Sequence, residues 1–125
     1  VMLLVLFGAM MSCTDTISTP KKTQVAQIDS LNTVAFSLVR KRQWNTAYQL
    51  AEKADSLAKI SNYKKGSARS LRIKAHYWNH ENDAAKAFQT LQFSENLEKQ
   101  TKHYKGLLAV YNTQALLLLV RKCCG

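Results

Sequence analysis

Proline and glycine are nearly absent from this chain of 125 residues, which has one proline and four glycines. Residues 21–124 contain no proline, and Gly66 and Gly106 are their only glycines. Folds rich in β-strands and α/β folds need many tight turns, in which glycine, proline and Asn-Gly pairs are common. The scarcity of these residues excludes a β-sandwich, a β-barrel and a Rossmann-type unit. A chain of this length forms one domain, and we expect it to be all-α, with long helices joined by short polar loops.

Acidic side chains are also few, with 8 Asp and Glu against 18 Lys and Arg and a formal net charge of +10. This excess favours acidic partners, such as an acidic protein segment, an anionic lipid surface or nucleic acid. A solvated basic surface without a partner is the alternative. Nucleic-acid binding rests on charge alone and conflicts with the export signal described below, so we expect no nucleic-acid partner.

Motifs for catalysis and for cofactor or metal binding are missing. The sequence has no glycine-rich phosphate loop, no Gly-x-Ser-x-Gly and no His-Glu-x-x-His. His76 and His80 have the i, i+4 spacing that can chelate a metal, but no second ligand pair accompanies them, and we expect them to face solvent or line a groove. Cys13, Cys123 and Cys124 form neither a zinc-binding pattern nor a disulfide framework. We therefore expect no enzymatic activity, no cofactor and no metal site.

The N-terminal segment is a candidate export signal. Residues 1–11 carry no charge and are almost wholly apolar, but a bilayer span needs about 20 residues, so their length is that of a signal-peptide core. The segment ends at Ser12-Cys13, after which the chain turns polar. This pattern resembles a bacterial lipoprotein signal, although Met10 stands where leucine is commoner and no basic residue precedes the apolar run. An ordinary secretory signal or anchor and a buried core element are the alternatives.

The lipoprotein resemblance implies a location and a domain organisation. Residues 1–12 would be a signal peptide, Cys13 would be lipidated, and residues 13–27 would form a flexible tether, since they are rich in Thr and Ser and contain Pro20. The protein would then lie in the cell envelope, lipid-anchored to a membrane and facing the periplasm or the exterior.

The remainder of the chain repeats itself every 40 residues. A shift of 40 positions aligns small and apolar residues and both inner glycines: Leu31 with Leu71, Ala35 with Ala75 and Ala115, Ala47 with Ala87, Lys65 with Lys105, and Gly66 with Gly106. Within each unit apolar residues recur at helical spacing, and polar connections fall at 40–43 and 80–83, where Asp83 suits a helix N-cap. Each unit is therefore predicted to be a helical hairpin, with the glycines at the junctions between hairpins. Neither helix can bury its stripe alone, so the hairpins should stack.

Two alanines twelve positions apart, one in each helix of a unit, carry a family resemblance. Ala35 and Ala47, with Trp44 at the turn, and Ala75 and Ala87 resemble the tetratricopeptide repeat (TPR) over residues 28 to about 120. The period is 40 where about 34 is usual, and the proline at the repeat end is missing. Longer repeats of this kind occur in sensor regions of histidine kinases and transcriptional regulators. The resemblance implies a TPR-like α-solenoid of stacked helical hairpins, with about two and a half repeats over residues 28–122.

The third unit holds one helix only, predicted at residues 104–122. Its expected packing face consists of Leu108, Tyr111, Ala115 and Leu118, and further leucines make it apolar nearly all round. Terminal repeats normally have a polar outer face. Either the chain is truncated within its third repeat, which we favour, or this face is a docking or dimerisation surface.

The TPR resemblance implies that the first helices of the units line a concave groove that receives a peptide. The side chains expected on the groove side are Asn32, Phe36, Arg69, Arg72, His76, Asn79 and Asn112. Arg69 and Arg72 lie i, i+3 and can hold a carboxylate in a bidentate manner. We predict a membrane-anchored interaction scaffold for a peptide or protein partner, with acidic partners favoured. The alternative is the N-terminal extracytoplasmic sensor portion of a TPR-containing histidine kinase or transcriptional regulator.

Overall fold

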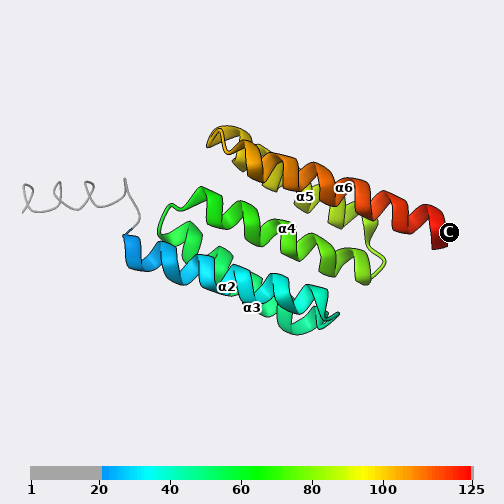
Figure 1. Cartoon of the computed structure of the whole chain (residues 1–125), viewed down its shortest axis with the longest axis horizontal. Helices are drawn as coiled ribbons and strands as arrows, with labels where there is room; N and C mark the ends of the chain where they lie inside the picture. Colours follow the sequence, from blue (N-terminus) through cyan, green and yellow to red (C-terminus); the bar gives the residue numbers. More distant parts are fainter. Residues whose placement is uncertain (1–20, 125) are drawn as a thin grey trace, which may run out of the picture.

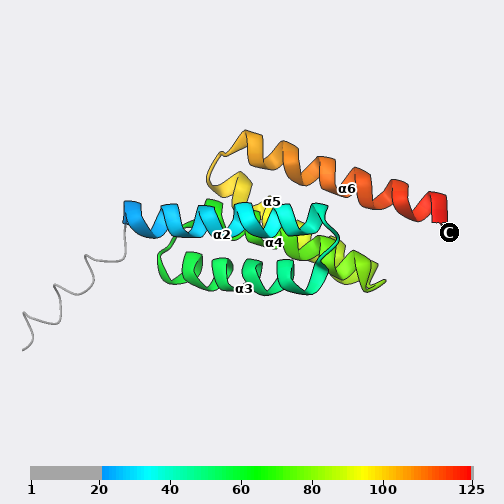
Figure 2. The ribbon, with the colours of Figure 1, turned by 60° about the horizontal axis from the view of Figure 1, so that its bottom comes forward.

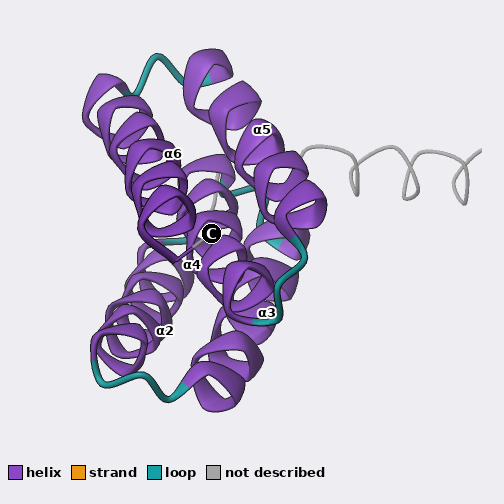
Figure 3. Ribbon diagram, turned by 90° about the vertical axis from the view of Figure 1, so that its right-hand side faces the viewer, coloured by secondary structure: helices purple, strands orange, loops and turns teal. Residues whose placement is uncertain are grey.

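The computed structural model describes residues 21–124, with side chains to residue 119, and this part of the chain is all-helical. Its five helices are α2 (Lys22–Arg40), α3 (Trp44–Ile60), α4 (Lys64–His80), α5 (Ala84–Gln100) and α6 (Tyr104–Cys124). Successive helices run antiparallel, and α4 lies between α2 and α6 (Figure 1). Figure 2 shows α2 lying along α3 as one hairpin. Viewed along the helices, α2, α4 and α6 form one layer and α3 and α5 the other (Figure 3). The predicted all-α class is confirmed.

All four connections between the helices have the same geometry. The backbone of Arg42 has a φ of 60°, and its N–H donates to the carbonyl of Val39 at 3.0 Å, while the next N–H, of Gln43, donates to Leu38 at 2.9 Å. These two bonds form a Schellman motif, which satisfies the last carbonyls of a helix. The same pair of bonds recurs every twenty residues, around the positive-φ residues Arg42, Asn62, Asn82 and Lys102. The connections predicted at 40–43 and 80–83 are confirmed, and so is the N-cap, since Asp83 Oδ1 accepts the N–H of Lys86 at 3.0 Å.

Gly66 and Gly106 do not supply the positive φ of these turns. Both lie in the first turn of a helix, α4 and α6 respectively, and neither has a positive φ. A Cβ on Gly66 would lie 2.7 Å from Cγ2 of Ile28 in α2 and 2.6 Å from Cδ2 of Tyr63. The missing side chain therefore allows α2 and α4 to approach closely, and the role of this glycine is in packing.

Small residues form the contacts between paired helices. Ala35 of α2 packs with Ala47 and Ala51 of α3, and Ala75 of α4 packs with Ala87 of α5. Half-buried aromatic side chains, Trp44 in the first hairpin and Trp78 in the second, lie against these clusters. Alanine lets the helix axes approach, and larger side chains fill the space beside it. The two predicted alanine pairs do meet in the core.

The predicted tether is too long at its C-terminal end. Helix α2 begins at Lys22, so residues 22–27 are helical and not a spacer. The physical reason is that Pro20 is the last helix breaker before Gly66, and nothing after it prevents the helix. Cys13 and the predicted signal peptide at residues 1–12 lie outside the described residues. In the described part, no helix is both long and apolar enough to span a bilayer.

Helix α6 packs with a different face from the one predicted. Val110, Thr113 and Leu117 are buried against the preceding helices, while the expected face is open, with Leu108 61% and Leu118 52% exposed. In the 40-residue register the open positions, Leu108, Tyr111, Ala115 and Leu118, correspond to Ala68, Leu71, Ala75 and Trp78 of α4. On α4 this face packs against α5. No helix follows α6 in the described residues to cover it.

A buried polar network joins α3 to α4. The carboxylate of Asp55 is almost completely buried and accepts hydrogen bonds from Ser67 Oγ at 2.5 Å and from Lys74 Nζ at 3.2 Å. The Lys74 ammonium also lies 3.0 Å from Oε2 of Glu52. The ammonium of the exposed Lys59 lies 3.1 Å from Oδ2 of Asp55. Sequence periodicity did not reveal this network, because charged residues are normally counted as the surface face of a helix.

Candidate functional site

A groove runs along α4 between α2 and α6. Both of these helices pack against α4 but not against each other, which leaves a face of α4 between them. Two hollows lie along this face. One is near the start of α4 and has a volume of about 460 Å³, and the other is near its end and has a volume of about 570 Å³.

The first, which we call the basic hollow, is rich in cations. Four cationic side chains and two carboxylates line it: Lys65, Arg69, Arg72, Lys105, Asp29 and Glu98. Both carboxylates already have partners. The hydroxyl of Tyr63 donates to Asp29 Oδ1 at 2.9 Å, and Nδ1 of His103 lies 2.6 Å from Glu98 Oε2.

The pKa shifts around the basic hollow are caused mainly by burial. Burial, followed by the hydrogen bond to Asp29, raises the pKa of Tyr63 to about 12, so its hydroxyl remains a donor at neutral pH. Burial lowers the pKa of Arg72, and the charge of nearby Glu98 opposes this shift, although a guanidinium remains charged in proteins. Among the described residues, neither Arg69, Arg72, Lys65 nor Lys105 has a carboxylate within ion-pair distance. The cations of the hollow are therefore available to an anionic ligand.

The second, which we call the aromatic hollow, has one cationic side chain, Arg42, and no carboxylate in its lining. Its lining includes Trp44, His76, Asn79, His80 and Leu116. The rings of Trp44 and His80 stack with centroids 4.9 Å apart and an interplanar angle of 19°. Burial lowers the pKa of His76, and the charge of Arg72 lowers it further, which favours the neutral imidazole. This end of the groove suits an apolar group with a few hydrogen-bonding atoms.

Of the seven groove residues predicted from the sequence, the structure places four along the open face of α4. Arg69 and Arg72 line the basic hollow, and His76 and Asn79 line the aromatic hollow. Phe36 is half-buried and packs against the core of the first hairpin. Asn112 is exposed on α6 and lines neither hollow.

The placement of Asn32 on the groove side is wrong. Its side chain is fully buried, donates to the carbonyl of Gly66 at 3.0 Å and accepts from Ser70 Oγ at 2.8 Å. The reason is its position in the series Ile28, Asn32, Ala35 and Val39, all of which are buried. The amide links α2 to α4 and is not accessible to a partner.

Sequence reasoning missed several residues of the basic hollow. Lys65 and Lys105 both line it, and their alignment in the 40-residue register was a signal that could have found them. Glu98 and His103 gave no such signal, because their contact depends on the turn between α5 and α6. Across residues 21–119 no group of three His, Cys, Asp or Glu side chains is placed to hold a metal ion.

Comparison of the chain with protein-family models, with curated proteins and with solved structures finds no match. The resemblances to TPRs and to lipoprotein signals therefore rest on the residues described above, and they remain predictions.

Proposed function

We propose that this chain is a TPR-like α-solenoid that acts as a protein-interaction scaffold and binds an acidic peptide or protein segment in the concave groove along α4. The observation that carries the proposal is the basic hollow, where Arg69 and Arg72 lie beside carboxylates that are bonded to other side chains. Arg69 is oriented by a hydrogen bond from Nη2 to Thr33 Oγ1 at 3.2 Å. Arg72 is already half-buried, so an incoming carboxylate finds a guanidinium that is partly desolvated and weakly screened.

The length of the groove sets the size of the bound segment. Arg69 and Asn79 are ten residues apart on α4, which corresponds to about 15 Å along a helix. An extended peptide covers that distance with about four or five residues. The segment would place an acidic group in the basic hollow and an apolar or aromatic side chain near Trp44 and Leu116.

Charge reversal of the two arginines tests the groove. The Arg69→Glu, Arg72→Glu variant should lose its preference for acidic octapeptides over their Asn and Gln counterparts on a peptide array. The expected loss in affinity is at least about tenfold, because two charge-assisted contacts become repulsive. Circular dichroism should show an unchanged helical content, since neither side chain belongs to the buried core.

The matched control is the Lys22→Glu, Lys53→Glu variant, which changes the net charge equally at two exposed positions outside both hollows. It should keep most of the preference for acidic peptides. An equal loss in both variants would point to net charge alone, and an unaffected arginine variant would reject the groove assignment.

We also propose that Cys13 is lipidated and anchors the protein to a membrane of the cell envelope. The support is the apolar run before Ser12-Cys13. Cys13→Ala should move the protein from the membrane fraction to the soluble fraction. The intact mass of the wild-type cellular protein should exceed the mass of the chain from Cys13 onward by that of its acyl groups. A Cys13→Ala variant that stays in the membrane fraction would favour an ordinary signal or anchor.

The open face of α6 favours a second candidate function, the extracytoplasmic sensor portion of a TPR-containing histidine kinase or transcriptional regulator. Leu108, Tyr111 and Leu118 occupy positions that on α4 are covered by the next helix. A longer array would cover them in the same way. The same mass measurement separates the two candidates, since a sensor protein would be heavier by whole helices.

A further inference from the structure

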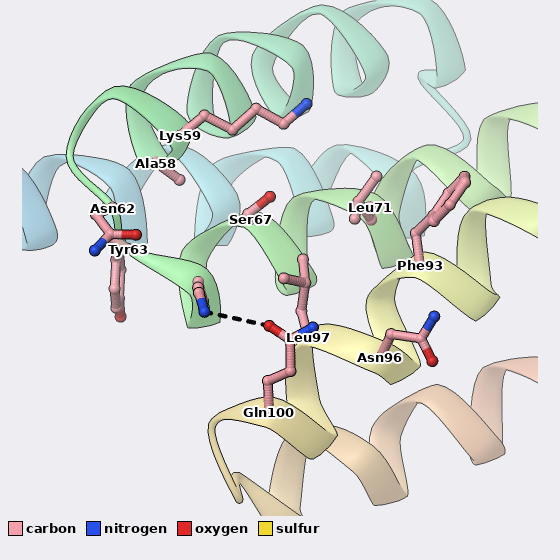
Figure 4. Close-up of a pocket in the computed structure, with 11 residues that line it drawn as sticks. Ala58, Lys59, Asn62, Tyr63, Ser67, Leu71, Phe93, Asn96, Leu97 and Gln100 are labelled. Atoms are coloured by element: carbon pink, nitrogen blue, oxygen red, sulfur yellow. Dashed lines mark hydrogen bonds between the residues drawn. The ribbon is translucent and has the colours of Figure 1, made fainter.

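A third cavity lies on the other side of α4 from the groove, between α3 and α5 (Figure 4). These two helices pack against α4 but do not contact each other. The space between the C-terminal half of α3, the start of α4 and the C-terminal half of α5 has a volume of about 580 Å³. Small-molecule sites in proteins typically occupy about 300–1,000 Å³, so this cavity has the size of a ligand site.

The walls of the cavity are mostly apolar. Leu71 and Leu97 are half-buried there, and the phenyl ring of Phe93 lies at one end with 54% of the residue exposed (Figure 4). In the 40-residue register Phe93 corresponds to Lys53, which is exposed. The repeat therefore does not require an apolar side chain at this position for packing, and the exposed phenyl ring is free to contact a ligand.

The rim of the cavity is polar and carries positive charge. Lys64 and Gln100 both line the cavity, and Lys64 Nζ donates to Gln100 Oε1 at 3.2 Å. Lys59 also lines the cavity, but its charge is balanced by Asp55 at 3.1 Å. No carboxylate is among the lining residues, and within the described part of the chain Lys64 forms no ion pair. Its charge is left facing a neutral amide.

We propose that this cavity binds a small carboxylic acid with an aliphatic or aromatic body. The body would lie on Leu71, Leu97 and Phe93, and the carboxylate would replace the Gln100 amide oxygen as the acceptor of the Lys64 ammonium. A cation would be repelled by Lys64, and a neutral alcohol would gain only the apolar contact. The site shares Tyr63 with the basic hollow, but its other lining residues differ, so the proposal does not depend on the peptide-binding function.

Three probes with the same chain length separate the charge from the apolar contact. Octanoate, 1-octanol and octylammonium are titrated into the full chain and followed by isothermal calorimetry. Octanoate should bind about fivefold more tightly than octanol, because a solvent-exposed ion pair contributes at most about that factor to affinity. Octylammonium should bind most weakly. Equal affinities for octanoate and octanol would overturn the proposal.

Two variants locate the site. Lys64→Glu should weaken the binding of octanoate about fivefold or more. Glutamate is compatible with the first position of α4, because negative charge is favourable at a helix N-terminus. Phe93→Ser should weaken the binding of octanoate and of octanol by about tenfold each, because both ligands lose the same apolar contact. Both side chains are exposed, so the fold should persist.

The controls are Lys53→Glu, an exposed charge reversal outside the cavity, and Leu119→Ser, which removes an exposed apolar side chain from α6. Both should leave the affinity for octanoate within about twofold, less than a single surface ion pair contributes at most. The proposal fails if Leu119→Ser weakens the binding of octanoate as much as Phe93→Ser does, because the ligand would then lie on α6. It also fails if Lys64→Glu and Phe93→Ser both leave the affinity unchanged.

Discussion

Asp55→Ala is expected to lower the free energy of unfolding by about 3 kcal/mol, the lower end of the range for breaking a buried ion pair. The substitution removes the acceptor of two buried donors, Ser67 Oγ and Lys74 Nζ. Glu52 remains within 3.0 Å of the Lys74 ammonium, and this second partner keeps the loss from being larger. Urea denaturation followed by circular dichroism measures the effect.

The control for Asp55→Ala is Lys59→Ala, which removes another cation from the same carboxylate. The Lys59 side chain is 69% exposed, and exposed ion pairs contribute only about 0–1 kcal/mol. The urea midpoint of this variant should therefore stay near that of the wild type. Equal midpoints for Asp55→Ala and Lys59→Ala would show that the buried network does not hold α3 to α4.

The helices could be predicted from the sequence because their physical causes are local. Helical periodicity and the absence of breakers between Pro20 and Gly66 act within one or two turns. The alanine pairs also could be predicted, because a 40-residue register repeats the same close contact twice. The turns at 40–43 and 80–83 were placed correctly, although positive φ in the first falls on Arg42, a residue type that gives no turn signal. The junctions assigned to Gly66 and Gly106 lie at residues 61–63 and 101–103.

The polar interior could not be predicted, because polarity alone says nothing about which face of a helix meets a neighbour. Asn32 and Asp55 are both buried. The free-energy cost of burying each polar side chain is offset by hydrogen bonds to another helix. The packing face of α6 was wrong for a related reason. The 40-residue register identifies the face that α5 covers on α4, but it does not supply the covering helix.

The candidate site depends on α4 more than the sequence indicated. One face of this helix forms the floor of the groove between α2 and α6, and another forms the floor of the cavity between α3 and α5. The i, i+3 spacing of Arg69 and Arg72 was visible in the sequence. The approach of Lys105 and the burial of Glu98 required the packing of α5 and α6 against α4.

Gly106→Ala is expected to destabilise the protein by about 3 kcal/mol, the cost of overpacking together with a disturbed buried charge. In a helix with free space at this position, replacing glycine by alanine would stabilise the protein by about 1 kcal/mol through helix propensity. The sign of the stability change therefore shows whether the position is crowded. A methyl group on Gly106 would overlap the carboxylate of Glu98, and it would lie 2.6 Å from Nδ1 of His103. Glu98 is almost completely buried, so it cannot move aside without losing its 2.6 Å contact with His103.

A double variant isolates the cause of this loss. In a Glu98→Ala background the obstructing carboxylate is gone, so adding Gly106→Ala should cost much less than it does in the wild type, a non-additivity of about 2 kcal/mol. Lys105→Ala, at the exposed position beside Gly106, should change stability by no more than about 0.5 kcal/mol. Additive effects of Gly106→Ala and Glu98→Ala would mean that the close approach of α6 to this carboxylate is not what requires glycine. Thermal denaturation of the four proteins of the cycle decides between the two outcomes.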